Sequence, residues 1–568
     1  MSDAVTATVD ARGPKKGIDW FPYVVAILSG IILVVFLAYP IGKTTLYSFV
    51  LLDDDLTFGN LTLANFRNFI EVPLYTDALQ NSITIAAWTT VATVVLALPA
   101  AYAVARIDIP YRTFLLTFSI IPLIAPPFIG AYSWIILFGN QGMIRRYFDI
   151  LFGIDIPTIY GPFGIVLALS LHYFPFVFLF TQGALAASDP FIEESAHIMG
   201  APRSRIMCSI TFPLVIPAIG AGAVLVFVRT LGNFGVPAVL GKEYMVLTTL
   251  MVYQVNGYFN LNAASAIALA NVALTLIAVF FLARIQRRRR FITVTSTTRA
   301  AKRHTGRGAK IAGNAYVWSL FILAVMPQII VLFYSFAERW AGSLWPQRMG
   351  WGNYHHVLTE LTEPIFNSIF LAGGATLLAV FFGTLAAYIS QRKQFFGKWL
   401  LDMTIMLPFI MPGIITGVAF LTTFNTGILI LTGTASIIML AYFVRRLAYI
   451  FRAVSAAISQ VDNKIDEAST ICGAAWGYTM RRVTIPLVAP GMLAGGILVF
   501  STLIIELSIT IMVYSADWQT MSVLMFEQLL DDQIEYATAT GSIAIILTIS
   551  LVFAASRLVG KSMADMFR

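Results

Sequence analysis

The sequence predicts an all-α, polytopic membrane protein with about twelve transmembrane helices in two homologous six-helix halves that form a parallel repeat. Three observations support this fold class: the composition, the spacing of the apolar segments and an internal repeat. Of the 568 residues, 58% are hydrophobic and 12% are charged. Soluble domains average about 45–50% apolar and about 25% charged residues, so a soluble enzyme, a disordered chain and a collagen-like fibre are excluded.

The apolar segments are long enough to cross a bilayer, because each spanning helix needs about 20 such residues. They lie at roughly 20–42, 79–104, 113–137, 162–182, 208–232, 264–284, 314–336, 366–390, 399–424, 428–448, 484–508 and 538–557. Residues 1–19 are polar, and the apolar segment after them is too long for the core of a signal peptide. We therefore interpret 1–19 as a cytoplasmic N-terminal tail before a retained first helix.

The distribution of charge predicts the orientation. With the N-terminus in the cytoplasm, most of the 37 Lys and Arg residues fall on the inner side. The outer loops then hold more than half of the 29 acidic residues, including Asp53 and Asp531. Because cytoplasmic loops are enriched in basic residues, both termini are expected to be cytoplasmic.

Residues 285–313 form a basic segment between the sixth and seventh spans. Four consecutive arginines, Arg287 to Arg290, open it, and it contains no acidic residue. Such a segment is compatible with recognition of lipid or nucleic acid. We instead interpret it as a cytoplasmic linker that fixes the topology, and we expect no nucleic-acid partner. It joins two units of six spans each, at 20–284 and 314–568.

The two units repeat each other at matched spacing. The matched pairs include Asn81-Ser82 with Asn367-Ser368, Arg106 with Arg392, Pro126 with Pro412, Asp189 with Asp462, Glu194 with Glu467, and Gly200 with Gly473. A longer external loop around 139–161 of the first half accounts for the one change in register. An even number of spans per unit gives both halves the same direction, and such a pair encloses a central pathway.

The best-matched segments are the cytoplasmic loops 189–217 and 462–490. Each opens with Asp as a helix cap, continues with a short helix that carries Glu and small residues, and reaches a Gly that permits a tight turn. A second helix then leads to a Pro. The pattern predicts a compact helix–turn–helix that docks on a partner protein, with these key residues: Glu193, Glu194, Ala196, Gly200, Pro213, Glu467, Ala468, Gly473 and Pro486.

These two loops resemble the coupling loop of bacterial ABC importer permeases, in which Glu-x-Ala-x-x-x-Gly precedes a Pro. Ser195 and Ser469 replace small alanines of that pattern. Ser is also small, so docking is still expected. Both halves resemble type I importer permease domains, and their fusion in one chain is similar to the ferric-iron permeases of binding-protein-dependent importers.

The resemblance implies a division of labour between subunits. This chain would form a multi-pass pathway in the bacterial inner membrane. Two copies of a separate ABC ATPase, which bind ATP and Mg, would dock one under each coupling loop. A periplasmic or extracellular binding protein would deliver substrate. This chain is expected to hold no cofactor, no metal and no catalytic residue.

Sequence motifs of enzymes are not evident. Gly42-Lys43-Thr44 imitates the end of a phosphate-binding loop, but Leu37 occupies the position where that loop needs Gly. The two cysteines, Cys208 and Cys472, exclude a disulfide scaffold and give no support for a structural zinc site.

Ionisable residues inside predicted spans are candidates for the substrate pathway, because burying them in a bilayer is costly. Glu506 and its repeat partner Asn233 are expected at the interface between the halves, with Arg229 one turn before Asn233. Either these three residues line the pathway, or Glu506 and Arg229 form a structural pair or helix-end hydrogen bonds. His172 is interpreted as a buried core histidine. Arg445 and Arg446 are expected to extend toward the inner boundary.

Two alternatives stay open at this stage. An ion-coupled secondary transporter also has two parallel halves, but it would need no repeated docking loop and would carry several buried acidic residues. Among substrates, ferric iron is the first expectation, and the acid-rich outer face would suit a cation. Phosphonates, sugar phosphates, polyamines and thiamine are alternatives, and Arg229 in the pathway would favour an anion.

Overall fold

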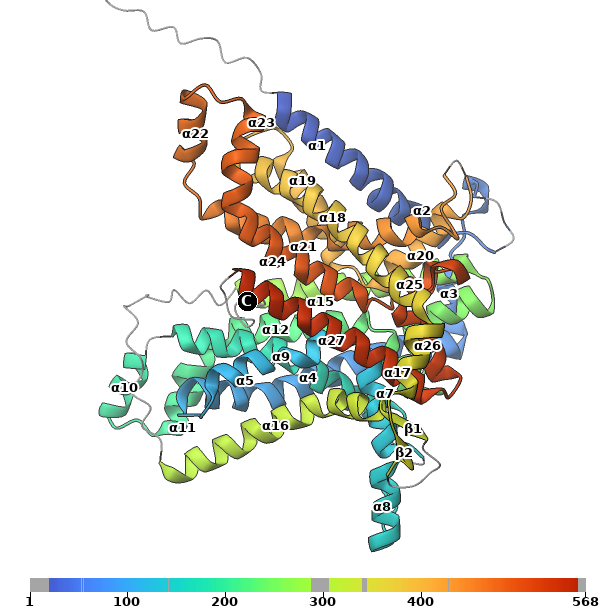
Figure 1. Cartoon of the computed structure of the whole chain (residues 1–568), viewed down its shortest axis with the longest axis vertical. Coiled ribbons are helices and arrows are strands. Elements are labelled where there is room, and N and C mark those ends of the chain that lie inside the picture. The colour runs from blue at the N-terminus through green and yellow to red at the C-terminus, as the bar shows by residue number, and fades with distance from the viewer. Residues whose placement is uncertain are drawn as a thin grey trace, which may run out of the picture.

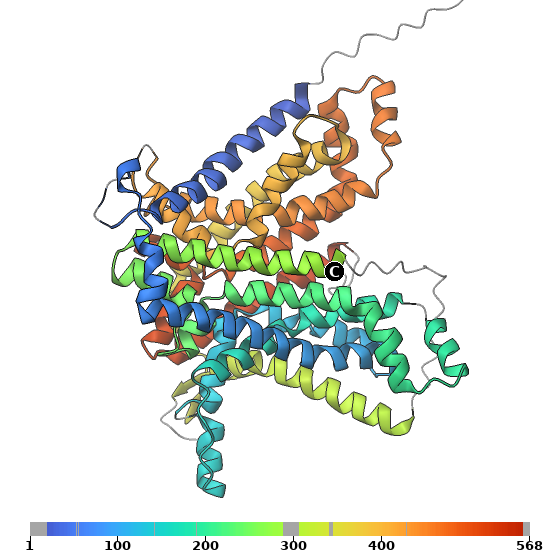
Figure 2. The same ribbon diagram turned by 180° about the vertical axis from the view of Figure 1, so that it is seen from behind.

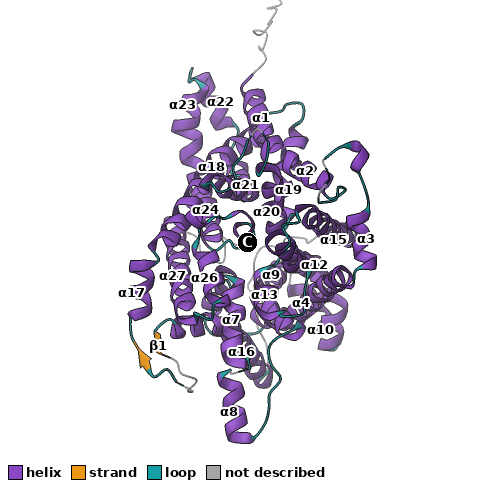
Figure 3. Ribbon diagram, turned by 90° about the vertical axis from the view of Figure 1, so that its right-hand side faces the viewer, coloured by secondary structure: helices purple, strands orange, loops and turns teal. Residues whose placement is uncertain are grey.

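The computed structural model describes residues 20–52, 54, 56–140, 142–188, 190–287, 306–339, 345–427 and 429–559. The predicted tail 1–19 and most of the predicted linker lie outside these ranges. Within them the chain is almost entirely helical (Figures 1 and 3). One antiparallel hairpin of β1 (Ala337–Arg339) and β2 (Arg348–Met349) is the exception in the described part. The predicted all-α class is confirmed.

The long helices follow the order of the predicted spans. In the first half they are α1 (Trp20–Leu33) with α2 (Tyr39–Tyr47), α4 (Pro73–Arg106), α5 (Arg112–Phe118), α7 (Pro127–Phe138), α9 (Pro162–Ala187), α12 (Phe212–Leu231) and α15 (Leu261–Arg287). In the second half they are α16 (Arg307–Tyr334), α18 (Thr362–Arg392), α19 (Lys398–Ile410), α20 (Gly413–Phe424), α21 (Ala435–Ser459), α24 (Ile485–Ile504) and α27 (Ile534–Val559). Helix α16 begins inside the segment that was expected to be linker.

Nine described helices are long and apolar enough to cross a membrane, and up to 11 spans result if each of two bent pairs counts as one. The remaining predicted span, 428–448, corresponds to α21, which begins later than expected. This helix has 25 residues and carries Arg445, Arg446 and Arg452 along its length. These three charges, and not a lack of apolar residues, explain why α21 is not counted among the nine.

Two predicted spans are not straight helices. Segment 113–137 bends by 92° and segment 399–424 by 103°. The second helix of each pair has Pro as its N-cap, Pro126 before α7 and Pro412 before α20. Proline cannot donate a backbone hydrogen bond and disfavours helical geometry in the residue before it, so each helix stops there. The two prolines are repeat partners, and the break is therefore a feature of both halves.

The first span of each half packs on the opposite half (Figures 1 and 2). Helices α1 and α2 contact α18, α19 and α20, whereas α16 contacts α4, α7 and α9. Hydrogen bonds support both crossings: Thr44 and Thr422 join their hydroxyls at 2.9 Å, and Ser133 Oγ donates to the Pro327 carbonyl at 2.9 Å. The packed units therefore differ from the two sequence halves.

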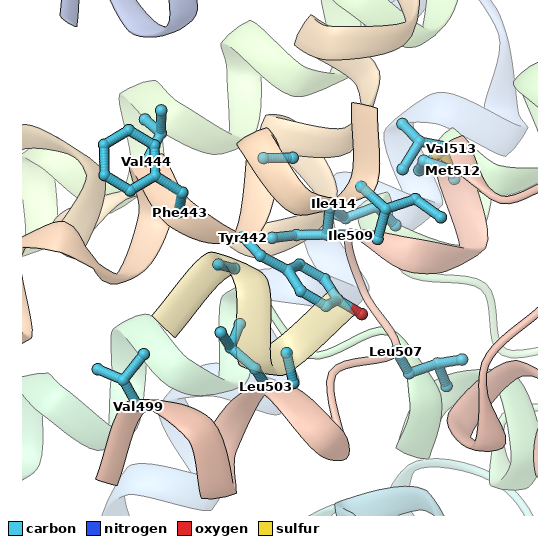
Figure 4. Close-up of a cluster of buried hydrophobic side chains, with 14 of the residues drawn as sticks. Ile414, Tyr442, Phe443, Val444, Val499, Leu503, Leu507, Ile509, Met512 and Val513 are labelled. Atoms are coloured by element: carbon cyan, nitrogen blue, oxygen red, sulfur yellow. The ribbon is translucent and has the colours of Figure 1, made fainter. Parts of the chain in front are cut away.

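Small residues bring the central helices of each half close together, as is common in membrane proteins. Helix α4 packs on α9, and α18 packs on α21. Gly383 of α18 shows how tight this packing is, because a Cβ there would lie 2.9 Å from the Cβ of Ile450 in α21. Apolar side chains fill the remaining space. Figure 4 shows such a cluster around Tyr442, with Leu503, Leu507 and Ile509 among its members.

The longer external loop predicted at 139–161 contains a helix, α8 (Met143–Phe152), that extends away from the bundle (Figures 1 and 2). Helices α10 (Pro190–Ile198) and α22 (Lys464–Ile471) lie at the opposite end of the spans. Helix α1 begins near α22 and α23 (Trp476–Thr479), at that same end of the molecule. Both predicted docking loops thus face the same side.

Candidate functional site

The two coupling loops have the predicted helix–turn–helix form. In the first loop α10 is followed by Gly200 and then α11 (Arg203–Ile206); in the second, α22 is followed by Gly473 and then α23. Gly200 has a φ of +85° and Gly473 a φ of +80°. This left-handed conformation is disfavoured for residues with a Cβ, so the tight turn at each Gly is confirmed. Pro213 and Pro486 lie in the first turns of α12 and α24, where proline is tolerated.

Helices α10 and α22, which we call the coupling helices, both end in exposed apolar side chains. Ile198 and Met199 are 85% and 88% exposed, and their counterpart Ile471 is 85% exposed. We call these three residues the apolar tips. Glu194, Glu467 and Ala468 are also exposed, whereas Ala196 is partly buried. Apolar groups that protrude beside carboxylates at the end of a short helix are a surface suited to a protein partner.

An ion pair anchors each coupling helix to the second span of its own half. Arg106 at the end of α4 binds Glu193 at 2.8 Å, and Arg392 at the end of α18 binds Asp466 at 3.2 Å. The same arginines also bind residues just before the coupling helices. Arg106 donates to Ser188 Oγ at 2.7 Å, and Arg392 donates to the Val461 carbonyl at 2.8 Å. Glu193 is therefore partly buried, whereas Glu194 is exposed.

Sequence reasoning missed these anchors, although the signal was present. Arg106 and Arg392 are repeat partners, and an acidic residue precedes the motif glutamate in both loops: Glu193 in the first and Asp466 in the second. Because both partners of this ion pair have charged counterparts in the other half, the two halves could have been expected to share the contact. Asp466 was not among the predicted site residues.

A second repeated contact lies at the opposite end of the spans and explains the repeated Asn-Ser pair. Ser82 Oγ accepts from the Leu247 backbone at 2.8 Å, and Ser368 Oγ accepts from the Met521 backbone at 2.7 Å. The asparagines donate to backbone carbonyls two residues earlier in the same loops. Asn81 Nδ2 donates to the Met245 carbonyl at 2.9 Å, and Asn367 Nδ2 donates to the Gln519 carbonyl at 3.1 Å. These contacts tie each second span to the loop before the last span.

Glu506 lies just beyond the C-terminal end of α24 and is buried. Its two carboxylate oxygens accept from Arg445 at 3.1 Å and from Arg446 at 2.9 Å. The three side chains are only 7%, 11% and 6% exposed. The expectation that Arg445 and Arg446 extend toward the inner boundary is therefore wrong. A buried carboxylate would be costly without such partners. Glu506 in turn fixes the guanidinium groups of these two arginines, which lie near the middle of α21.

Gly413, the first residue of α20, makes room for Arg445. A Cβ on Gly413 would lie 1.6 Å from Nη1 of this arginine. The site is therefore shaped around the guanidinium group by a residue of a third element, and this requirement is invisible in the local sequence of α21.

Arg229 forms a different contact. Its Nη2 donates to the hydroxyl of Tyr449 at 2.6 Å, which joins α12 of the first half to α21 of the second. Arg229 and Glu506 are both described, and no ion pair joins them. The alternative of a direct structural pair between Glu506 and Arg229 is therefore wrong. Together we call Arg229, Arg445 and Arg446 the arginine cluster.

The first half repeats the geometry of the Glu506 site with neutral groups. The repeat aligns Asn233 with Glu506 and Tyr173 with Arg446, and Asn233 Nδ2 donates to the Tyr173 hydroxyl at 3.0 Å. The backbone support is also the same, because Thr248 donates to the Asn233 carbonyl at 2.9 Å and Ser522 to the Glu506 carbonyl at 2.8 Å. One scaffold thus carries a hydrogen bond in one half and an ion pair in the other.

The two equivalent sites lie near each other. The Tyr173 hydroxyl donates to the Arg229 carbonyl at 3.5 Å, and the Arg229 side chain in turn contacts Tyr449 of the second half. The ring of His172 packs against that of Tyr173 with 4.8 Å between centroids. His172 is therefore packed in the interior, as expected of a core histidine.

The imitation of a phosphate loop at Gly42-Lys43-Thr44 lies within helix α2. Lys43 Nζ donates to the Thr423 carbonyl at 3.3 Å, and Thr44 bonds to Thr422. These residues pack α2 against α20. A phosphate-binding loop needs free backbone N–H groups ahead of a helix, and residues inside a helix do not supply them.

Comparison with known proteins agrees with this architecture. The family described as "Binding-protein-dependent transport system inner membrane component" matches residues 93–291 and again residues 379–565. Curated relatives include the ferric transport system permease protein FbpB of Actinobacillus pleuropneumoniae, which is 29% identical over 81% of this chain and 68% of its own length. The putative ferric transport system permease protein FbpB 1 of Haemophilus influenzae is 32% identical over 70% of this chain and 64% of its own.

Shorter relatives cover less than half of this chain. The putative 2-aminoethylphosphonate transport system permease protein PhnV of Salmonella typhi is 28% identical over 43% of this chain and 93% of its own length. A relative of this size agrees with the interpretation of the chain as two fused units. Because the family matches twice and covers more than half of the sequence, the chain belongs to the inner membrane components of binding-protein-dependent transport systems.

Proposed function

We propose that this chain is the membrane-spanning subunit of an ATP-driven importer that takes up ferric iron from a soluble binding protein. The observation that carries the proposal is the pair of coupling helices at one end of the molecule, each with an exposed apolar tip next to a left-handed Gly. The family acts together with binding proteins. Two relatives that align with most of this chain are named as ferric permeases.

The apolar residues at the tip of each coupling loop would dock in one copy of an ABC ATPase. Burying an isoleucine side chain contributes about 1.5–3 kcal/mol, so Ile198 and Ile471 would each provide a substantial part of a docking interface. Repeat-related loops on the same side suit two identical ATPase subunits. That side would be the cytoplasm, and both termini would lie there, as the distribution of basic residues predicts.

The anchors suggest how ATP-driven motion would reach the membrane. Closure of the ATPase dimer would move α10 and α22 as rigid elements. Arg106 and Arg392 join these helices to the ends of α4 and α18, so each second span would move with its coupling helix. Such movement would switch the chain between two packed arrangements, one open to each side.

ATP and Mg would bind to the ATPase subunits, and this chain would contribute no catalytic residue. The purified chain alone is therefore expected to hydrolyse no ATP. Hydrolysis should appear when the ATPase subunit is added.

A phosphonate is the second candidate substrate. The arginine cluster favours an anion, and one single-half relative is named as a 2-aminoethylphosphonate permease. Sugar phosphates, polyamines and thiamine are further alternatives from the same class of importer.

Reconstitution tests the proposal. The chain, its ATPase and its binding protein are placed in proteoliposomes, and the uptake of radioactive ferric iron is compared with that of radioactive 2-aminoethylphosphonate. We expect iron uptake that requires ATP and all three proteins. Uptake of the phosphonate without uptake of iron would establish the second candidate in place of the first, and ATP hydrolysis by the chain alone would contradict the division of labour.

A further inference from the structure

We propose that the arginine cluster and Glu506 form a transient binding site for an anionic substrate, so that ferric iron crosses as a complex with oxyanion or hydroxide ligands. The bare trivalent cation would then not be the transported species. The identity of the metal rests on the function proposed above. The charge of the transported species rests on the contacts in this structure.

The site lies where the two halves meet. Arg229 comes from α12, Arg445 and Arg446 come from α21, and Glu506 follows α24. Helices α12 and α24 are equivalent in the repeat, and the hydrogen bond from Arg229 to Tyr449 connects the halves directly. A parallel repeat encloses its pathway along the axis between its halves, so these charges lie at the position expected for a substrate.

The charges at the site do not balance. One carboxylate, Glu506, faces three guanidinium groups, and it already binds both Arg445 and Arg446. Arg229 donates to the neutral hydroxyl of Tyr449. Arg446 is only 5% exposed, and among the described residues its Nε has no hydrogen-bond acceptor. Guanidinium donors suit oxyanions, with which they form strong charge-assisted hydrogen bonds.

The fold itself does not require this excess charge. In the first half, Tyr173 and Asn233 occupy the positions of Arg446 and Glu506 with a neutral hydrogen bond. In the second half, the position equivalent to Arg229 is Thr502. Since the same scaffold forms with neutral residues, its geometry alone does not account for the arginines. A buried excess of positive charge repels a bare trivalent cation and attracts an anionic complex.

The net charge that crosses with each iron tests this inference whatever the ligand is. Proteoliposomes that contain the complete transporter, with iron-loaded binding protein outside and ATP inside, are held at a potassium diffusion potential with valinomycin. Uptake of radioactive iron and the accompanying current are measured together. We expect zero or negative charge per iron, and an inside-positive potential should not slow uptake.

A current of close to three positive charges per iron, slowed by an inside-positive potential, would overturn the inference while leaving iron import intact. Absence of iron uptake would contradict the proposed function instead, so the two failures are distinguishable.

Variants of Arg229 test the same site without disturbing Glu506. Replacing Arg229 by Gln removes the charge, and uptake should fall by about tenfold, the effect of losing one charge-assisted contact. Arg229→Lys keeps the charge and should retain most uptake. Thr502→Val, at the equivalent position of the second half, is the matched control and should transport normally. Unchanged or faster uptake in Arg229→Gln would contradict an anion site.

Discussion

Arg446 donates to Glu506 at 2.9 Å at the position where the repeat in the first half has a neutral hydrogen bond. The two halves support these positions with equivalent backbone contacts from Thr248 and Ser522. The sequence repeat has therefore kept its geometry and changed its chemistry. An asymmetric polar centre results between the two repeated halves.

Replacing Glu506 by Gln should destabilise the chain. Both guanidinium groups would lose their carboxylate, and breaking a buried ion pair costs about 3–5 kcal/mol. Thermal unfolding of the purified chain in detergent measures this loss. Glu506→Gln combined with Arg446→Gln should recover part of it, whereas Glu506→Gln combined with Arg229→Gln should recover none. Asn233→Ala is the matched control, with an expected loss of about 1 kcal/mol. Unchanged stability in Glu506→Gln would contradict the structural role of the pair.

Replacing Gly473 by Ala should uncouple transport from ATP hydrolysis. The φ of +80° at Gly473 leaves space for a methyl group but strains the backbone of any residue with a Cβ. The strain, about 1–2 kcal/mol, would reorient α22 relative to α23. Gly477→Ala is the control, since Gly477 lies in the same loop with open space and no positive φ. The ratio of iron imported to ATP hydrolysed should fall several-fold in the first variant only, at equal amounts of inserted protein. Gly200→Ala should behave in the same way, and equal ratios in all variants would show that the turn is unimportant.

Breaking an anchor should weaken coupling, and exchanging its charges should restore it. Arg392→Asp or Asp466→Arg alone places like charges together at a site where the side chains are 7% and 20% exposed. The double variant recreates an ion pair with reversed polarity. We expect the coupling ratio to drop in each single variant and to rise again in the double variant. If both single variants couple normally, the anchor does not transmit motion.

Docking of the ATPase should protect Cys472. Both cysteines of the chain are free and exposed, and Cys472 lies between Ile471 of the apolar tip and Gly473. In a Cys208→Ser background it is a single reporter, and its reaction with a maleimide should slow by about tenfold or more when the ATPase binds. The maleimide reaction of Cys208, measured in a Cys472→Ser background, is the control for a cysteine outside the apolar tips. Equal reactivity of Cys472 with and without ATPase would place the docking surface elsewhere.

Much of this architecture could be predicted because membrane helices leave strong local signals. Apolar length identified the spans, and the repeat identified equivalent positions such as Gly200 and Gly473. The bends in segments 113–137 and 399–424 were missed because apolar runs continue through them. Their prolines, Pro126 and Pro412, carried the signal, and Pro327 inside α16 shows that proline alone does not identify a break.

The polar centre could be predicted only in part because its partners are far apart in the sequence. Glu506, Asn233 and Arg229 were recognisable as costly residues inside spans. Their contacts were not, since the hydrogen bond from Arg229 to Tyr449 joins helices of different halves. The packing of the first span of each half on the opposite half could not be predicted for the same reason. It depends on contacts such as Thr44 with Thr422, which involve ordinary threonines.

The composition of the assembled complex tests the central claim most directly. Native mass spectrometry of the purified transporter counts the ATPase subunits bound to each chain. The account predicts two in the wild type and none when Ile198 and Ile471, the two isoleucines of the apolar tips, are both replaced by Glu; each is 85% exposed in this structure. The variant must retain the thermal stability of the wild type, as expected for exposed positions. Two ATPase subunits still bound to this variant would contradict docking through the coupling helices.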